Sequence, residues 1–570
     1  MHQSQVTSGS ANIKLIVAAS ALLVITWFTR CEHLTDSLWI DELHTAWSID
    51  GEFSEIADRA ASGNQPPLYF WMNRLITKSG AVDPVRIRTL SFLMTWLTAT
   101  VLFTLIAKLS SHNLLAFVWA ALYLLDRRVF VFSVEARPYA ALQFVALLHV
   151  WCFVLLMAPR GAKRMRLLIV AWVITGVLMC QLHYTSLLLV PAEWFGWFLF
   201  NGMKHKIVQT AARPLNFRTF AGATIAMTVV CLISSGHILE ILNKREMWSQ
   251  FVSVKSLRYT LLSMPVIPVL ITLAVATRLF ISMASDPAHD KWNQAFARIL
   301  VGVIGFTFVV SWVATATGLM PIFFSRYLVS VLPLVYLAGG LAISRSDVQP
   351  VTCTLVTLLV LVFSTQLMWD WRGKVLEPHK REHWPEAISV INQITPEADK
   401  IYLAASLIED HDLVTNPGLL LAGGHTLQEF CGFPIRCQSD DELMGRQVIA
   451  VPSRRPALSS SQIDECKSDE LMVLVARGSK ATERWLSQLQ NILGASWHVR
   501  LYSGSALDRS ALLLLAKHVS AYRAGVLWMA EFQDTWSTSR IRRYRQTHSV
   551  VSLVAFPGQV PCGYTQQEYG

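Results

Sequence analysis

Charged residues are scarce in this sequence. Only 15% of its 570 residues are Asp, Glu, Lys or Arg, whereas 53% are hydrophobic. A soluble protein of this length carries far more charge, so this composition excludes a wholly soluble chain and indicates that most of it lies in lipid. The 20 Trp and 27 Phe residues agree with aromatic belts at membrane interfaces. In a multi-pass membrane protein, excess Lys and Arg collect in cytoplasmic loops. The net charge of +10 therefore predicts basic cytoplasmic loops, and no nucleic-acid partner is expected.

Several familiar site patterns are also missing. No CxxC or HExxH spacing for a metal occurs. The triplet Ser503-Gly504-Ser505 does not match a phosphate-binding glycine pattern. No inverted repeat of the kind found in transporters is visible. The polar segment 1–12 precedes an apolar run without a clear small-residue cleavage site, which predicts a retained membrane anchor. No cofactor is therefore expected to be required.

Hydrophobic runs of spanning length predict a polytopic α-helical membrane protein with about 11 to 13 spans. Such runs begin at Ile13, Leu90, Leu114, Ala140, Leu167, Ser186, Phe220, Tyr259, Ile299, Ile322 and Val351. The short loops 159–166 and 201–219 carry Lys and Arg but no acid, so we expect them on the cytoplasmic side. Counting from these loops puts the N-terminus in the cytoplasm and everything after Trp369 outside it.

The composition changes at Asp370, which predicts two domains. We expect a transmembrane domain over residues 1–370 and a soluble extracytoplasmic domain over residues 371–570. The second domain is predicted to be α/β, because short strand-like runs alternate with helical stretches. The strand-like runs are 400–404, 448–451 and 471–475, and the helical stretches are 382–394 and 483–493.

Four cysteines fall in this second domain: Cys431, Cys437, Cys466 and Cys562. An extracytoplasmic compartment favours disulfides, and Cys431 and Cys437 form the nearest pair in the sequence. Spacing alone does not determine which cysteines pair.

The first outer loop, residues 31–88, carries two adjacent acids, Asp41 and Glu42. Neighbouring carboxylates repel each other and are usually compensated by a cation, a metal or a substrate proton. The alternative is a solvated loop with ordinary acids. An apolar stretch near 66–77 begins with two prolines and is short for a span, so we expect a helix lying flat in the interface. Asp41 would then face the same side as the loop around Glu135.

Two further groups of polar residues lie at the ends of predicted helices. Glu135 and Arg137 form either a salt bridge that stabilises their loop or a polar floor for an anionic ligand. His183, beside Tyr184, is either a ligand or proton carrier or a hydrogen-bonded histidine at the interface.

Cations on the predicted outer side form another group. Arg326 either extends to lipid headgroups or binds a phosphate bidentately. Lys244 and Arg245 lie in the outer loop 236–258, against the positive-inside bias. This exception predicts an anionic lipid headgroup or lipid phosphate as the partner, with a rim of solvated charge as the alternative.

Four motifs occur in order along the first 370 residues. They are Leu38-Trp39-Ile40-Asp41-Glu42, Gln65-Pro66-Pro67-Leu68-Tyr69, Glu135-Ala136-Arg137-Pro138-Tyr139, and Arg326-Tyr327-Leu328 with Leu332-Pro333. Together they make the chain resemble glycosyltransferase family 39, the group that contains protein O-mannosyltransferases and the bacterial aminoarabinose transferases of lipid A. The C-terminal domain adds little to this resemblance, because such tails vary in the family.

The resemblance implies the C-type glycosyltransferase fold in a bacterial inner membrane, with the active site at the periplasmic face. The donor would be a sugar on a polyprenyl phosphate, and the acceptor a lipid, a glycan or a protein. By motif position, Asp41 would be the catalytic carboxylate, with Glu42 beside it. Many relatives have His before the double proline, whereas this chain has Gln65, which weakens a metal role at that position.

The chemistry of such a transfer suggests a role for each residue. An inverting transfer needs a base for the acceptor proton, and we expect Asp41 to be that base. Glu42 would orient the acceptor or make Asp41 a stronger base by repulsion. These two carboxylates could also hold a divalent metal, which the sequence does not require.

The leaving lipid phosphate needs cations. We expect Arg137 and Arg326 to supply them, with Lys244 and Arg245 in reserve. The expected supporting residues are Glu135, Tyr139, Tyr69, His183 and Tyr184.

Two other functions fit the hydropathy profile. One is a transporter or flippase for polyprenyl-linked sugars, although the acids lie in loops and a large outer domain follows the last span. The other is a non-catalytic scaffold of an envelope polysaccharide complex, in which the C-terminal domain does the work. A scaffold would tolerate the substitution Asp41→Asn.

Overall fold

The computed structural model describes residues 3–77, 83–110, 112–157, 162–207, 216–234, 288–324, 326–343, 350–364 and, with short gaps, 382–453, together with residues 471–477, 484–485 and the strands beyond residue 485. The chain forms two compact units. The first contains Met1–Leu34, Asn64–Thr77 and Val85–Glu377, and the second contains Thr35–Gly63, Lys78–Pro84 and Pro378–Gly570. The segment that carries Asp41 and Glu42 therefore belongs to the same unit as the C-terminal residues.

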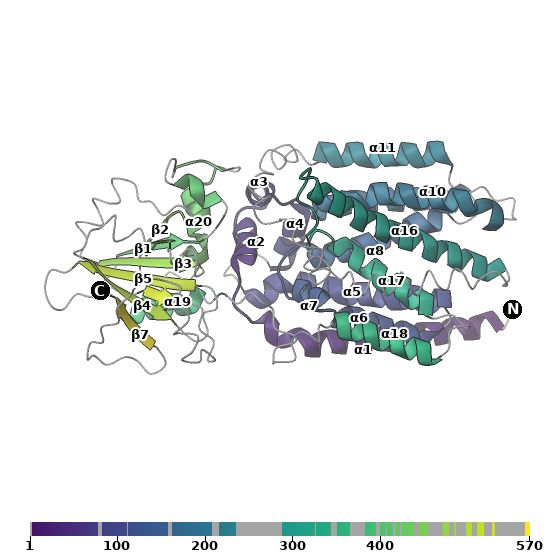
Figure 1. Cartoon of the computed structure of the whole chain (residues 1–570), viewed down its shortest axis with the longest axis horizontal. Coiled ribbons are helices and arrows are strands. Elements are labelled where there is room, and N and C mark those ends of the chain that lie inside the picture. Colours follow the sequence, from purple (N-terminus) through teal and green to yellow (C-terminus); the bar gives the residue numbers. More distant parts are fainter. Residues whose placement is uncertain are drawn as a thin grey trace. The chain divides into compact units, whose positions relative to one another are not determined.

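The first unit is helical (Figure 1). Its helices are α1 (Gln3–Leu34), α4 (Leu68–Thr77), α5 (Pro84–Ser110), α6 (Asn113–Leu125), α7 (Arg127–Ser133), α8 (Tyr139–Met157), α9 (Ala162–Leu182), α10 (Leu189–Ile207), α11 (Phe217–Ser234), α16 (Ala288–Ala316), α17 (Leu332–Ile343) and α18 (Pro350–Ser364), with the 3-10 helices η1 (Tyr184–Leu188) and η2 (Val329–Val331). Helix α8 begins at Tyr139, directly after Pro138 and one residue before the apolar run predicted from Ala140, and α4 occupies the short apolar stretch near 66–77.

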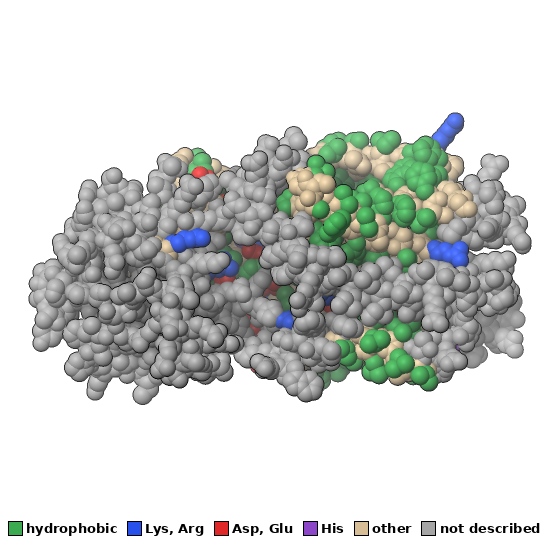
Figure 2. Space-filling model, viewed as in Figure 1, with side chains coloured by type: hydrophobic (Ala, Val, Ile, Leu, Met, Phe, Trp, Pro, Cys, Tyr) green, Lys and Arg blue, Asp and Glu red, His purple; other side chains and the backbone are tan. Residues whose placement is uncertain are grey.

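Five helices in the described part of the chain are long and apolar enough to cross a membrane. They cover Asn12–Leu34, Pro84–Ser110, Tyr139–Met157, Lys163–Leu182 and Phe296–Ala316, and three shorter apolar helices accompany them. Figure 2 shows hydrophobic side chains gathered over the helical unit. On α9, Leu167, Val170, Ile174 and Leu178 are all exposed, at the three- and four-residue spacing of one helix face. Such a face is suited to lipid, and the prediction of a multi-pass membrane protein is confirmed.

One predicted span begins later than expected. The apolar run from Ile322 starts with turns, and helix α17 begins only at Leu332. The hydroxyl of Thr315 accepts hydrogen bonds from the backbone N–H groups of Ile322 and Phe323, at 3.0 and 2.8 Å. These bonds satisfy the backbone N–H groups at the start of the run, which therefore need no helix. The run from Tyr259, together with Lys244 and Arg245, lies outside the described residues.

The second unit combines helices with a seven-stranded sheet. Its helices are α2 (Ile40–Asp50), α3 (Ile56–Ser62), α19 (Trp384–Ile394), the 3-10 helix η3 (Glu409–Leu413) and α20 (Leu427–Arg436). Its strands are β1 (Lys400–Ala404), β2 (Gln447–Ala450), β3 (Leu471–Arg477), β4 (Trp497–Ser503), β5 (Ser510–Lys517), β6 (Leu527–Met529) and β7 (Thr565–Tyr569).

The strand order is β2-β1-β3-β5-β6-β4-β7, with an additional pairing of β4 and β5. Strand β1 pairs in parallel with β2 and β3, whereas β5 is antiparallel to both β3 and β4. Residues Ile401 to Ala404 of β1 are all buried, as is typical of a central parallel strand. The α/β prediction is confirmed. The predicted helix over 483–493 lies mostly outside the described residues.

The disulfide suggested by the nearest cysteine pair does not form. Cys431 and Cys437 are both free thiols. Cys431 lies within α20 and Cys437 caps its end. Six residues along a helix separate two α-carbons by about 9 Å of rise, whereas a disulfide joins α-carbons less than about 7 Å apart. Burial raises the pKa of the Cys431 thiol well above its ordinary value, so this thiol stays protonated. Cys466 and Cys562 lie outside the described residues.

Candidate functional site

Helix α2 begins at Ile40, directly after its N-cap residue Trp39, and Asp41 and Glu42 lie in its first turn. Asp41 is half-buried and Glu42 is buried. The first turn of a helix carries free N–H groups and the positive end of the helix dipole, which stabilise negative side chains. This helix end therefore supplies part of the compensation that the sequence analysis assigned to a cation, a metal or a proton.

Glu42 helps to hold the start of α2. Its Oε2 accepts a hydrogen bond from the backbone N–H of Trp39 at 3.3 Å, as the glutamate of a capping box does. The box is only half formed, because the Trp39 indole has no acceptor to offer in return. Since Glu42 is buried and engaged in this way, Asp41 is the more accessible carboxylate of the pair.

A third carboxylate, from the C-terminal part of the chain, lies at the same helix end. Glu382 Oε2 accepts hydrogen bonds from the backbone N–H of Ile40 at 2.9 Å and from the Trp384 indole N–H at 3.2 Å. Its other oxygen, Oε1, accepts from Arg477 Nε at 2.7 Å. The Glu382 side chain is fully buried. Glu382 and Arg477 were not among the predicted site residues, because nothing local to either residue points to α2.

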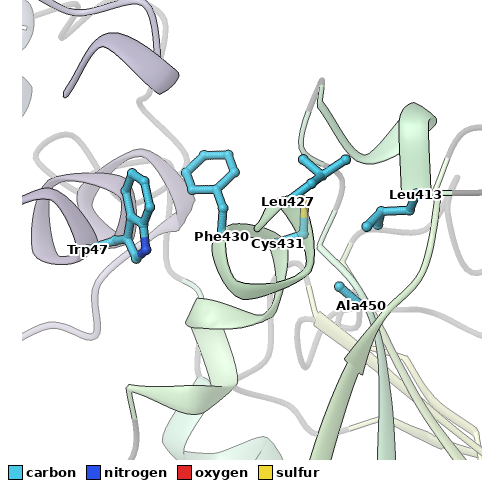
Figure 3. Packing of buried hydrophobic residues seen from close by; sticks show 6 residues of the cluster. All are labelled: Trp47, Leu413, Leu427, Phe430, Cys431 and Ala450. Atoms are coloured by element: carbon cyan, nitrogen blue, oxygen red, sulfur yellow. The ribbon is translucent and has the colours of Figure 1, made fainter. Parts of the chain in front are cut away.

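The body of α2 packs on α20. Trp47 lies against Phe430, with ring centroids 4.8 Å apart, in a hydrophobic cluster within the second unit (Figure 3). The other buried members of this cluster are Leu413, Leu427, Cys431 and Ala450. His44 also packs edge-to-face on Phe430, at 5.7 Å. A β-carbon at Gly63 would come within 2.1 Å of His44 Nε2, so any larger residue there would displace the buried His44 ring.

The helical unit brings two of the predicted arginines to one histidine. His183 is buried directly after α9, and its Nδ1 lies 2.8 Å from the hydroxyl of Thr185. Burial lowers the pKa of His183 to about 3, and the positive charges of Arg137 and Arg326 add to this effect. His183 is therefore neutral at neutral pH. We call Arg137, His183 and Arg326 the Arg–His cluster.

Aromatic side chains surround the Arg–His cluster. The rings of Tyr139 and Tyr327 lie 5.7 and 5.5 Å from the His183 ring. The guanidinium carbon of Arg326 lies 5.2 Å from the centre of the Phe324 ring. The hydroxyl of Thr185 donates to the backbone oxygen of Tyr327 at 3.2 Å, which joins the segment after α9 to the segment before α17.

Tyr69 of α4 supports the loop that carries Arg137. Its hydroxyl lies 2.9 Å from the Ser91 hydroxyl, which donates to the backbone oxygen of Arg137 at 3.2 Å. Glu135 is buried in the same loop, and its backbone oxygen accepts from the Arg137 N–H at 2.8 Å. Tyr184 opens η1 directly after His183. The structure thus brings together Arg137, Arg326, His183 and Tyr139, and links Tyr69 to them.

A second buried polar group lies among the membrane helices. Glu193 Oε2 of α10 lies 3.2 Å from His149 Nε2 of α8 and accepts from the Trp172 indole of α9 at 3.0 Å. All three side chains are fully buried. Ionisable residues within membrane segments are expensive to bury and pair with one another, so this group ties three helices together. Glu193 lies inside an apolar run, which was the available signal that the sequence analysis did not use.

No family model matches the sequence, and no curated protein matches it. The fold is similar to several solved membrane proteins. ArnT from Cupriavidus metallidurans in the apo state has a TM-score of 0.47 at 13% identity, covering 89% of this chain and 98% of that one. The same protein bound to undecaprenyl phosphate has a TM-score of 0.45 at 13% identity, covering 90% and 98%. The apo oligosaccharyltransferase of Archaeoglobus fulgidus has a TM-score of 0.45 at 9% identity, covering 90% and 75%.

These values describe distant structural likeness. Membership of glycosyltransferase family 39, like the sidedness of the loops and a bacterial origin, therefore stays a prediction. So does a divalent metal at Asp41 and Glu42. Across the described residues, no group of three or more His, Cys, Asp or Glu side chains is placed to hold a metal ion.

Proposed function

We propose that this protein is an integral membrane glycosyltransferase that moves a sugar from a polyprenyl-phosphate donor to an acceptor hydroxyl or amine. The observation that carries this proposal is the Arg–His cluster, in which the buried ring of His183 packs on Tyr139 and Tyr327, close in sequence to Arg137 and Arg326. Guanidinium groups bind phosphate oxygens through paired, charge-assisted hydrogen bonds. A lipid phosphate is the anion that a multi-pass membrane protein meets at the membrane surface.

The four sequence motifs support the finer assignment to family 39. We propose the C-type fold, a bacterial inner membrane location and a periplasmic active site on the same grounds. The acceptor is a lipid, a glycan or a protein. Undecaprenyl phosphate, which one ArnT structure contains, is the carrier that we choose as the first probe.

The proposed reaction is a single displacement at the anomeric carbon. Asp41 takes the proton of the acceptor O–H or N–H while the acceptor atom forms its bond to that carbon. The bond between the carbon and the phosphate oxygen breaks, and the phosphate leaves with the electron pair. Arg137 and Arg326 stabilise the charge that develops on the leaving phosphate. Asp41 suits the role of base because it is the accessible carboxylate of the pair, whereas Glu42 holds the helix start.

The test is the fate of a polyprenyl-phosphate sugar labelled in the sugar, in membranes that contain the protein. A transferase releases polyprenyl phosphate and moves one label to an acceptor for each donor consumed. A transporter moves the intact donor across the bilayer and breaks no bond. Membranes without the protein are the control. Transfer that continues after chelation with EDTA is expected, because the proposed steps require no metal.

A further inference from the structure

We infer that Glu382 and Arg477, in the C-terminal part of the chain, form a positioning pair that fixes the helix start carrying Asp41. This inference rests on the proposed function, because it assumes that Asp41 acts as the base. Neither residue is proposed to contact the substrate or to transfer a proton. Their role is to determine where the first turn of α2 lies and, through that turn, the direction of the Asp41 carboxylate.

The hydrogen bonds at Glu382 carry the inference. The N–H of Ile40 belongs to the first residue of α2, where no carbonyl of the helix can satisfy it. Glu382 Oε2 accepts this N–H at 2.9 Å. A carboxylate in this place fixes both the position and the direction of the first peptide group, and Asp41 is the very next residue.

The position of Glu382 is itself tightly determined. Its two oxygens accept hydrogen bonds from three donors, on Ile40, Trp384 and Arg477. Burying a carboxylate is costly unless it is paired and hydrogen-bonded, so the three donors hold it in a single arrangement. Arg477 lies at the end of β3 and Trp384 at the start of α19. The helix start is thereby attached to the sheet and to a helix of the C-terminal region.

Packing fixes the rest of α2. Trp47, two turns after Ile40 on α2, packs on Phe430 of α20 (Figure 3). A helix held by hydrogen bonds at its first residue and by an aromatic contact further along has little freedom to slide or rotate. The C-terminal region is therefore needed for turnover even though none of its residues is proposed to touch the substrate.

The test compares steady-state kinetics of full-length variants. Glu382→Ala leaves the Ile40 N–H without its acceptor, and we expect kcat to fall by about 10- to 100-fold, as small misplacements of catalytic groups do. The donor KM is expected to stay within about twofold, because the Arg–His cluster belongs to the other unit. Glu382→Gln combined with Arg477→Met keeps an acceptor oxygen and removes the unmatched cation. This double variant is expected to be more active than Glu382→Ala.

Glu429→Ala is the matched control. Glu429 also accepts a helix-start N–H, that of Thr426 at 2.8 Å, in the same unit but on α20. It is half-exposed at the side chain. Its loss removes no hydrogen bond at the start of α2, so kcat should stay near the wild-type value. An equal fall of kcat in Glu429→Ala and Glu382→Ala would mean a general structural effect and would overturn the inference.

A double-mutant cycle with Asp41→Asn separates positioning from folding. If Glu382 acts through Asp41, Glu382→Ala lowers the rate in the wild-type background but not the residual rate of Asp41→Asn. Equal falls in both backgrounds, or a folded Glu382→Ala variant with wild-type kcat, would overturn the inference alone. Full activity of Asp41→Asn would instead overturn the proposed base. If Glu382→Ala does not fold, Arg477→Met, which removes one of the three donors that hold Glu382, carries the same comparison.

Discussion

The buried carboxylate of Glu382 accepts the backbone N–H of Ile40, 342 positions earlier in the chain, at 2.9 Å. The segment Thr35–Gly63 is thus built into the unit formed by the C-terminal residues. Deleting residues 371–570 would remove Glu382 and Phe430, which both support α2. Loss of function after that deletion therefore does not distinguish a scaffold from an enzyme, whereas a point substitution at Asp41 does.

The first prediction concerns donor binding by the Arg–His cluster. We expect Arg137→Ala and Arg326→Ala each to weaken binding of undecaprenyl phosphate by about 10- to 100-fold, because each removes a charge-assisted hydrogen bond worth about 1.5–3 kcal/mol. Titration of the purified protein with the lipid measures this change. Arg164→Ala is the control, since Arg164 is an exposed cation at the other end of α9. Equal weakening in all three variants would mean binding by general charge.

The second prediction concerns the pH dependence of stability. The folded state lowers the pKa of His183 from 6.5 to about 3. Between these values the unfolded chain binds a proton that the folded chain excludes, so stability falls as the pH drops from about 6.5 towards 3. We expect the midpoint of thermal unfolding to fall more between pH 7 and pH 5 in the wild type than in His183→Gln. Identical falls in the two proteins would contradict a neutral, buried His183.

The third prediction concerns the packing of α2 on α20. Phe430→Ala should destabilise the second unit by about 3–5 kcal/mol, because it opens a cavity beside Trp47. Phe53→Ala is the control in the same unit. Phe53 is 51% exposed, so its loss should change stability by no more than about 0.5 kcal/mol. Denaturant titration followed by tryptophan fluorescence measures both. Similar losses in the two variants would exclude a special role for the Trp47–Phe430 contact.

The fourth prediction concerns the buried pair His149 and Glu193. Replacing one partner leaves the other buried with one polar contact fewer, a loss of about 1–3 kcal/mol. The double variant His149→Leu with Glu193→Leu should therefore lose less than the sum of the single variants. Thermal unfolding in detergent gives the three values. Strictly additive losses would show that the pair is not coupled, despite the 3.2 Å between Nε2 and Oε2.

The sequence predicts much of the fold, because the signals involved are local. Apolar runs predict α5, α8, α9 and α16, and a proline before Tyr139 predicts where α8 begins. Short apolar runs predict β1 to β3. The late start of α17 could not be predicted, because the side chain of Thr315 satisfies the backbone of Ile322 and Phe323 from an earlier helix.

The candidate site was predictable in part. Arg137 and Arg326 were chosen from their motifs, and the positive charges of both lower the pKa of His183. Their role in phosphate binding stays a prediction. The role of Glu42 in the start of α2 depends on a helix that the sequence analysis did not predict at this position. The role of Glu382 could not be predicted, for a different reason. A single buried acid, hundreds of residues from the helix it supports, leaves no periodicity and no motif.

The most direct test of the central claim is the rate of sugar transfer from labelled undecaprenyl-phosphate donors, measured in membranes for the wild type and for Asp41→Asn. The two side chains have nearly the same shape, but the amide cannot take a proton. We expect a fall of about 100-fold or more, the contribution of a general base, with donor binding unchanged. Transfer at the wild-type rate by Asp41→Asn would contradict the account.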